Sequence, residues 1–295
     1  MEKIERYRKI FGKNFSISLP TEKIWTIRTN TLKISVESLI KKLNERGCTI
    51  EQIPFYKEGL WVKAPYNLSY SIEHILGYFF IQNASSMIPA LVLNPKKSET
   101  ILDLCAAPGA KTTQIAAMMK NEGVIVANDV ERERLKALRG NLQRCGVMNV
   151  VVTNMDGTKF WQTGLKFDKI LLDVPCTGTG TLIPRVLKSV NKNSIARLSK
   201  LQKKLLISAT KCLNDNGIIV YSTCSLEPEE NEENVDFAVR KLGLTIEKIK
   251  IDNLNFMPAL TEWEGKRFVN EIVNAIRIVP TERMEGFFIC KLRKF

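Results

Sequence analysis

From residue 99 onward, short apolar segments alternate with segments of helical length. The apolar segments predict strands at 99–107, 123–130, 149–156, 168–176, 217–224 and 286–292. The segments between them predict helices at 111–120, 131–146, 194–213 and 227–243, the last with acids crowded into its first turn. This alternation is typical of an α/β fold, in which a largely parallel sheet carries helices on both faces and binds ligands beyond the carboxyl ends of its strands.

The first 97 residues lack this rhythm. They contain a strand pattern at 23–34, a helix pattern at 35–47 and further strand-like sequence at 59–64. We therefore expect a small basic α+β domain over 1–97, a boundary near 94–99, and the α/β domain over 98–295.

Composition excludes several classes of protein. With 44% hydrophobic and 25% charged residues, the chain is globular rather than disordered or fibrous. It has no apolar run long enough to span a membrane and no signal-peptide pattern, so we expect an intracellular, cytoplasmic protein. Seven cysteines without a CxxC pair, together with the single histidine His74, argue against a disulfide framework, a metal site and Ser-His-Asp or Cys-His catalysis.

The net charge of +13 is unevenly distributed. Residues 174–214 contain eight basic and no acidic residues, and residues 1–100 contain fifteen basic and nine acidic ones, whereas residues 215–295 are net negative. A diffuse excess would indicate solubility or a basic proteome. A localised one favours a surface that binds a polyanion such as nucleic acid.

Small residues and acids gather where strands end. The loop after the first strand, CAAPGAK (105–111), lets a ligand approach the backbone at a helix N-terminus, although it matches neither a dinucleotide fingerprint nor a P-loop. Asp129, Asp156 and Asp173 end the next three strands. Each acid alone could equally be a helix cap, but three of them beside such a loop favour a nucleoside ligand.

Two cysteines follow neighbouring strands. Cys176 lies in the sequence DVPC and Cys224 in STCS, so both are expected at the same sheet edge as Asp173, with Lys111 as a local positive charge. The other cysteines fit buried small hydrophobes. A thiolate adds readily to carbon 6 of cytosine, which makes carbon 5 nucleophilic enough to accept a methyl group, and a second group must then help the thiolate to leave.

Taken together, CAAPGAKT, DVPCTGTG and YSTCSLEPEENE resemble the RsmB/NOP (Nol–Nop–Sun) family of S-adenosylmethionine-dependent RNA cytosine-5 methyltransferases. Further matching segments run from RTNTLK (28–33) and QNASSMIPALVLNP (82–95) to GFFICKLRK (286–294). The resemblance implies a class I, Rossmann-like methyltransferase domain with a mixed seven-stranded sheet. Ala110 and Thr177 stand where the family usually has Gly and Ser. The compact form resembles archaeal tRNA enzymes, without the helical or PUA appendages of other members.

The resemblance also implies roles for individual residues. Cys224 would be the nucleophile, Cys176 would assist product release, and Asp173 would protonate ring nitrogen 3 beside the cofactor. Asp129 would bind the ribose hydroxyls with Arg134 nearby, and Asp156 would meet the adenine amine. The loop that would hold S-adenosylmethionine comprises Cys105, Ala106, Ala107, Pro108, Gly109, Ala110 and Lys111.

The partner is expected to be RNA, most simply tRNA, bound through Arg28 and the basic run that includes Lys188, Arg197 and Lys204. We expect a monomer and leave an accessory specificity protein open. Four alternatives remain: ribosomal RNA as the substrate, Cys176 as the nucleophile (as in DNA cytosine-5 enzymes), a non-catalytic RNA-binding assembly factor, and, more remotely, a dinucleotide-dependent reductase.

Overall fold

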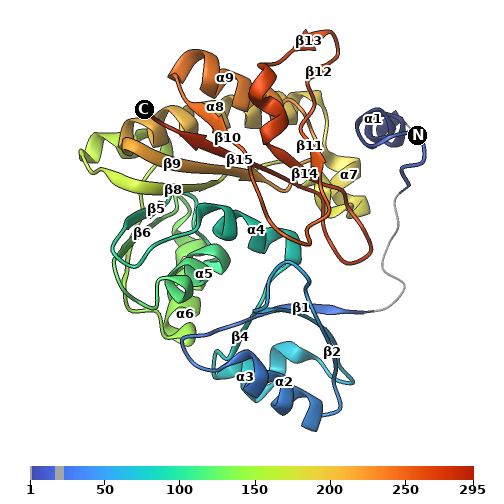
Figure 1. Cartoon of the computed structure of the whole chain (residues 1–295), viewed down its shortest axis with the longest axis vertical. Coiled ribbons are helices and arrows are strands. Elements are labelled where there is room, and N and C mark those ends of the chain that lie inside the picture. The colour runs from blue at the N-terminus through green and yellow to red at the C-terminus, as the bar shows by residue number, and fades with distance from the viewer. Residues whose placement is uncertain (1, 17–22) are drawn as a thin grey trace.

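A computed structural model describes residues 2–16 and 23–295. Figure 1 shows a large α/β unit and, below it, a small unit built from the N-terminal third of the chain. The small unit is a four-stranded antiparallel sheet in the order β2-β3-β1-β4. Its strands are β1 (Trp25–Thr29), β2 (Thr49–Gln52), β3 (Gly59–Lys63) and β4 (Phe79–Ile81). The helices α2 (Val36–Glu45) and α3 (Ile72–Ile75) and the 3-10 turn η1 (Leu68–Tyr70) complete it.

The large sheet has the order β11-β14-β15-β9-β8-β5-β6-β7, with β10 pairing to β15. Its strands are β5 (Thr100–Asp103), β6 (Val124–Asn128), β7 (Val150–Thr153), β8 (Phe167–Asp173), β9 (Leu213–Thr223), β10 (Thr245–Glu247), β11 (Met257–Pro258), β14 (Ile276–Ile278) and β15 (Phe287–Arg293). The five strands from β9 to β7 are parallel, and β15 and its neighbours are antiparallel. The mixed sheet was predicted, but with seven strands. The strands β10, β11 and β14 match none of the predicted segments, because they are too short to show a periodic pattern.

Helices cover both faces of this sheet. They are α4 (Ala84–Leu93), α5 (Ala110–Met118), α6 (Arg132–Cys145), α7 (Pro184–Ser189), α8 (Lys192–Cys212) and α9 (Glu232–Leu242). The remaining elements are η2 (Gly157–Thr163), η3 (Thr179–Thr181), η4 (Asn270–Asn274) and the hairpin β12 (Glu262–Trp263) with β13 (Lys266–Arg267). None of the described helices is both long and apolar enough to cross a membrane.

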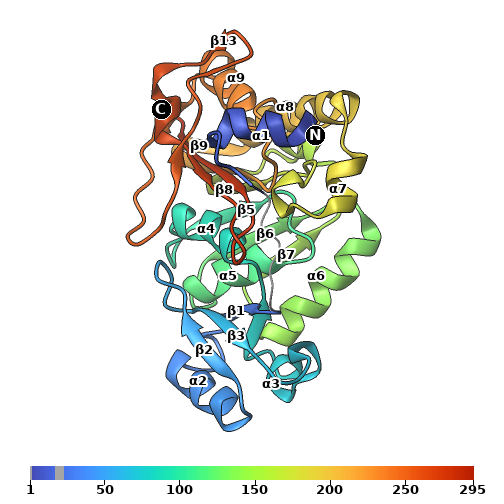
Figure 2. The same ribbon diagram turned by 90° about the vertical axis from the view of Figure 1, so that its right-hand side faces the viewer.

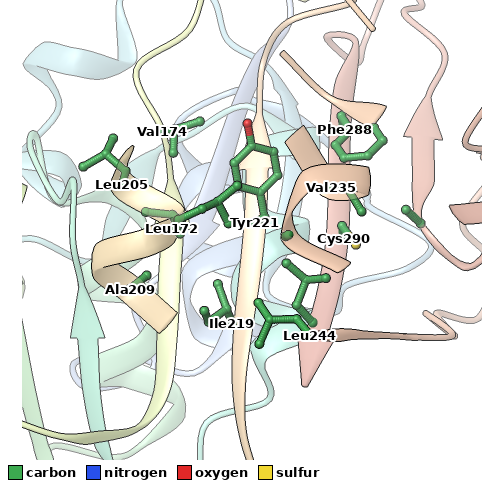
Figure 3. Packing of buried hydrophobic residues seen from close by; sticks show 14 of the residues in the cluster. Leu172, Val174, Leu205, Ala209, Ile219, Tyr221, Val235, Leu244, Phe288 and Cys290 are labelled. Atoms are coloured by element: carbon green, nitrogen blue, oxygen red, sulfur yellow. The ribbon is translucent and has the colours of Figure 1, made fainter. Parts of the chain in front are cut away.

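Alternating side chains of the central strands fill two cores. Leu172 of β8 and Tyr221 of β9 pack with α8 and α9 on one face, as Figure 3 shows, whereas Leu171 and Val220 pack with α4 and α5 on the other. Strands buried on both faces read as nearly continuous apolar runs, which is why the sequence predicts them well. The sheet is therefore a rigid base whose carboxyl edge positions the loops that follow.

The packing does not divide the chain at residue 97. The helix α4 contacts β8, β9 and β15 of the large sheet. The N-terminal helix α1 (Glu2–Phe11) also lies on the large unit, beside α7 and α8 (Figure 2), where Tyr7 and Ile10 are buried in its core and Lys3 donates to the carbonyl of Val190 at 2.6 Å. The helix α1 and most of the apolar face of α4 are buried against the large unit, while Ala84 and Met87 of α4 also pack with Ile53 and Trp61 of the small one.

The predicted helix over 227–243 begins later than expected. The helix α9 starts at Glu232, and the segment before it forms turns. Glu232 and Glu233 occupy the first turn of α9, so acids do lie at the helix start as predicted. The earlier acids are held by tertiary contacts instead: Glu227 pairs with Arg6 at 2.8 Å, and Glu230 is buried in contacts with other loops.

Candidate active site

Two thiols meet at the carboxyl edge of the large sheet. β8 and β9 are parallel neighbours, with Asp173 opposite Ser222, so the loops that follow them emerge side by side. The Sγ atoms of Cys176 and Cys224 are 3.2 Å apart, and neither cysteine is in a disulfide. The expectation that these two cysteines come together is confirmed.

The surroundings of Cys176 favour its protonated form. The hydrogen bond to Cys224 raises the pKa of the Cys176 thiol well above its ordinary value, and burial and the nearby charge of Glu230 act in the same direction. A thiol that keeps its proton can donate it to a neighbouring sulfur. The arrangement therefore favours Cys176 as a protonated donor that faces the sulfur of Cys224.

An ion pair joins the loop helix to the end of β8. Lys111 Nζ lies 2.7 Å from Asp173 Oδ2 and 2.8 Å from Ser86 Oγ, and Ser222 Oγ donates to Asp173 Oδ1 at 2.7 Å. The Lys111 side chain is buried, with its ammonium 5.4 Å from the centre of the Phe287 ring. The ammonium group of Lys111, the predicted local charge, thus pairs with Asp173 and Ser86.

The loop 105–111 is held by contacts with β6 and α6. Ala106 N donates to Asn128 O at 2.8 Å, and Asn141 Nδ2 donates to Pro108 O at 2.9 Å. Gly109 has a φ of +102°, and a Cβ there would lie 2.7 Å from the Leu138 side chain, so only glycine fits. Ala110 is the first residue of α5, where a methyl group is tolerated.

Asp129 and Arg134 support this loop. The Asp129 side chain is 2% exposed and accepts hydrogen bonds from the backbone N–H groups of Ala107 (3.1 Å) and Glu131 (3.0 Å). The Arg134 guanidinium lies 3.4 Å from Asp129 and donates to Ala107 O. Glu131, at the same strand end, is exposed and was not singled out from the sequence.

Asp156 caps the short helix η2. Its Oδ1 accepts from Thr158 N at 2.9 Å and from Thr158 Oγ1 at 2.7 Å, and the Thr158 hydroxyl lowers the pKa of the carboxyl group. The contacts of Asp156 are therefore those of a helix cap, the alternative role that the sequence left open for this acid. No metal-binding group of three His, Cys, Asp or Glu side chains occurs within residues 2–16 and 23–295.

Models of known families match both parts of the chain. The family described as 16S rRNA methyltransferase RsmB/F matches residues 90–293. The chain belongs to this family. It is thus an S-adenosylmethionine-dependent methyltransferase with a Rossmann-like fold. The N-terminal domain of 16S rRNA methyltransferase RsmF matches residues 2–84.

Curated relatives of this RsmB/F-family chain differ in length and in named substrate. A tRNA (cytosine(49)-C(5))-methyltransferase of Pyrococcus abyssi is 42% identical over 99% of this chain and 95% of its own length. The ribosomal RNA small subunit methyltransferase F of Vibrio parahaemolyticus is 41% identical over 91% of this chain but 56% of its own length. The 28S rRNA (cytosine-C(5))-methyltransferase of Mus musculus is 40% identical over 92% of this chain but only 35% of its own length.

Two solved structures have the same fold throughout. A methyltransferase homolog from Pyrococcus horikoshii matches with a TM-score of 0.87 at 39% identity, covering 99% of this chain and 94% of its own. NSun6 from Pyrococcus horikoshii, solved with the S-adenosylmethionine analogue SFG, matches with a TM-score of 0.85 at 29% identity, covering 98% and 97%.

The RsmB/F-family chain has an unpaired acidic oxygen that suits this cofactor. Asp103 ends β5; its Oδ2 accepts from Thr112 Oγ1 at 2.6 Å, but its buried Oδ1 has no hydrogen-bond partner. Burial raises the pKa of Asp103 to about 7. A buried acceptor beside the loop 105–111 suits a cationic donor such as the ammonium group of S-adenosylmethionine. Asp103 was not among the predicted site residues, because the apolar pattern places the end of the strand at residue 107 and not at Asp103.

One predicted RNA contact is wrong. Arg28 is 1% exposed, and its guanidinium donates to Gln82 Oε1 (2.9 Å), Thr113 Oγ1 (2.8 Å) and Ala110 O (3.3 Å). It joins the small unit to α5 and is closed off from solvent, because β1 packs against the start of that helix. The other predicted RNA contacts are exposed; they are Lys188, Arg197 and Lys204.

Proposed function

We propose that this enzyme transfers a methyl group from S-adenosylmethionine to carbon 5 of cytosine in RNA, through a covalent bond between Cys224 and the base. The observation that carries the proposal is the 3.2 Å approach of Cys224 to a thiol that keeps its proton, beside Asp173. Cytosine needs such a nucleophile because its carbon 5 is too electron-poor to attack a methyl donor directly.

Four side chains of the site each have a role in this mechanism. The Cys224 thiolate adds to carbon 6 while Asp173 delivers a proton to ring nitrogen 3, and Lys111, 2.7 Å away, is the adjacent proton reservoir. The cofactor supplies an electrophilic methyl group. A base then removes the proton from carbon 5, the bond from carbon 6 to sulfur breaks, and ring nitrogen 3 returns its proton to Asp173, while Cys176 donates its hydrogen bond to the departing sulfur.

Cofactor binding is assigned to residues around the loop 105–111. The loop itself, with Gly109 in its left-handed conformation, gives the ligand access to the backbone. Asp103 Oδ1 is proposed to accept from the ammonium group, Asp129 from the ribose hydroxyls beside Arg134, and Asp156 from the adenine amine. Asp129 would exchange hydrogen bonds from Ala107 and Glu131 for those of the ribose.

For the substrate we propose tRNA, with ribosomal RNA as the alternative. The tRNA assignment is supported by the Pyrococcus abyssi relative, of which the chain spans 95%, against 56% and 35% of the ribosomal enzymes. Exposed Lys188, Arg197 and Lys204 would contact phosphates. We also propose that the enzyme acts as a monomer in the cytoplasm. This proposal does not require an accessory protein.

Transfer of tritiated methyl groups to tRNA, followed by bisulfite sequencing, tests this function. Wild-type enzyme should place label at discrete cytosines, and Cys224→Ala should place none. If label appeared in ribosomal RNA alone, ribosomal RNA would replace tRNA as the proposed substrate. Absence of any cytosine methylation, with RNA binding intact, would favour the RNA-binding assembly factor instead.

A further inference from the structure

A buried carboxylate connects the two loops that carry the cysteines. Glu230 is 0% exposed and lies in the turn between β9 and α9. Its Oε1 accepts from Thr177 Oγ1 and from Ser225 Oγ, the latter at 2.7 Å. Its Oε2 accepts from Thr177 N at 3.1 Å and from Gln202 Nε2 at 2.7 Å. Thr177 directly follows Cys176 and Ser225 directly follows Cys224, so one side chain holds the neighbour of each thiol.

Glu230 is itself fixed. Its carbonyl oxygen accepts from Tyr221 Oη at 2.5 Å and from Asn234 Nδ2 at 3.1 Å. Gln202 of α8 also donates to Pro175 O at 2.9 Å, so the network holds the residue before Cys176 as well as the one after it. The backbones of the two loops are joined separately, by Gly180 N donating to Cys224 O at 2.8 Å. Loss of the carboxylate would therefore loosen the thiols without parting the loops.

The charge of Glu230 acts on the same pair. Burial raises the pKa of Glu230, and hydrogen bonds from Thr177, Ser225 and Gln202 oppose this. All four donors to the carboxylate are N–H or hydroxyl groups, from Thr177, Ser225 and Gln202, which suits an ionised acceptor. The titratable groups on which its charge acts are Cys176 and Tyr221, and Cys176 in turn contacts Cys224. A negative charge here disfavours a second one on Cys176.

We propose that Glu230 is a positioning residue that sets the separation of Cys176 and Cys224 through Thr177 and Ser225. The inference rests on the proposed function for its catalytic consequence, because only a thiol held at one place can attack carbon 6 and be assisted in leaving. Glu230 touches neither substrate nor cofactor. It acts through the two loops, and its charge helps to keep the proton of the pair on Cys176.

The test compares Glu230→Gln with Glu229→Gln. Glu229 is its half-buried neighbour, and its carboxylate pairs with Arg6 of α1 at 2.6 Å instead of with the cysteine loops. In Glu230→Gln the new amide group faces existing donors, so kcat should fall about 100-fold, the scale of a small misplacement of reacting groups. KM for RNA and Kd for S-adenosylmethionine should stay within about twofold of wild type. Glu229→Gln should retain wild-type kcat.

Thr177→Val is the second variant, because it removes one hydroxyl donor and leaves the buried charge in place. It should lower kcat about tenfold and Tm by only a few degrees, because Ser225 still donates to the same carboxylate oxygen, and it decides the matter if Glu230→Gln does not fold. Wild-type kcat in Glu230→Gln would overturn the proposal. If that variant is unfolded, wild-type kcat in Thr177→Val would do the same.

Thiol alkylation separates this inference from the proposed function. Iodoacetamide, with mass spectrometry to locate the label, reports on both cysteines without RNA. In wild type and Glu229→Gln, Cys224 should react first. In Glu230→Gln that preference should shrink and the reaction of Cys176 should begin at lower pH, because the nearby negative charge is gone. An unchanged pattern would contradict the inference even if the enzyme methylates no cytosine.

Discussion

Lys111 Nζ of α5 lies 2.7 Å from Oδ2 of Asp173, the last residue of β8. This contact ties the loop 105–111 to the strand that leads to Cys176, so it connects the proposed cofactor and cysteine sites. Ser86 of α4 and Ser222 of β9 extend it on either side. The ion pair between α5 and β8 is thus also hydrogen-bonded to α4 and β9 of the large unit.

Replacing Lys111 with methionine should reduce kcat about 100-fold, because Asp173 loses both its counter-ion and its proton reservoir. The free energy of unfolding should fall by about 1–3 kcal/mol, since Asp173 is only partly buried and water can compensate. Steady-state kinetics and thermal unfolding measure both. Lys136→Met, at an exposed pair with Glu133, is the matched control and should change neither. Wild-type kcat in Lys111→Met would remove this residue from the mechanism.

Asp103 should make cofactor affinity depend on pH. Its pKa is raised to about 7 by burial, against 3.8 without it. Between these values the folded protein holds a proton that the unfolded chain has released, so this group lowers the free energy of unfolding as pH rises through that window. An ammonium group paired with Oδ1 needs the carboxylate, so affinity for S-adenosylmethionine should increase as pH rises through about 7.

Isothermal titration calorimetry across this pH range would follow the change. Asp103→Asn should weaken binding about tenfold or more and abolish the pH step. Exposed Asp252→Asn should keep both the affinity and the step. A pH step that survives in Asp103→Asn must come from another group, and the assignment to Asp103 would then be dropped.

Arg28 should matter for folding and cofactor binding rather than for contact with RNA. Arg28→Met leaves the buried Gln82 Oε1 without its donor, whereas Ala110 O keeps the Thr113 hydroxyl, and the free energy of unfolding should fall by about 2 kcal/mol. Affinity for S-adenosylmethionine should fall, because Ala110 begins the helix that follows the loop. The salt dependence of RNA binding in Arg28→Met should equal that in the control variant Lys42→Ala, which changes an exposed lysine. A shallower salt dependence in Arg28→Met would return Arg28 to the RNA surface.

The sequence predicts best what depends on local pattern. The meeting of Cys176 and Cys224 follows from two neighbouring apolar strands, each with a cysteine at or just beyond its end. Arg28 and Glu230 could not be placed in the same way. A charged side chain is expected at the surface or at a helix start, and only contacts with distant segments bury these two. Asp103 carried the same strand-end signal as Asp173, but the apolar run after it concealed where the strand ends.

The basic run should bind RNA through its exposed side chains. Lys188→Ala combined with Arg197→Ala should weaken tRNA binding and reduce the slope of log affinity against log salt by about one to two. Calorimetric affinity for S-adenosylmethionine should not change. A double variant at exposed Lys241 and Lys248 removes the same charge from the net-negative C-terminal part and should leave the slope unaltered. Equal effects of the two pairs would mean that net charge, not this surface, governs binding.

The assignment of Cys224 as the nucleophile is tested most directly by trapping. RNA that carries 5-fluorocytosine cannot lose its substituent from carbon 5, so an enzyme that attacks carbon 6 stays covalently attached after methyl transfer. Wild-type enzyme and Cys176→Ala should form the adduct on denaturing gels, and Cys176→Ala should also accumulate one with ordinary RNA. Cys224→Ala should form none. An adduct in Cys224→Ala that disappears in Cys176→Ala would reverse the roles of the two thiols and contradict the mechanism.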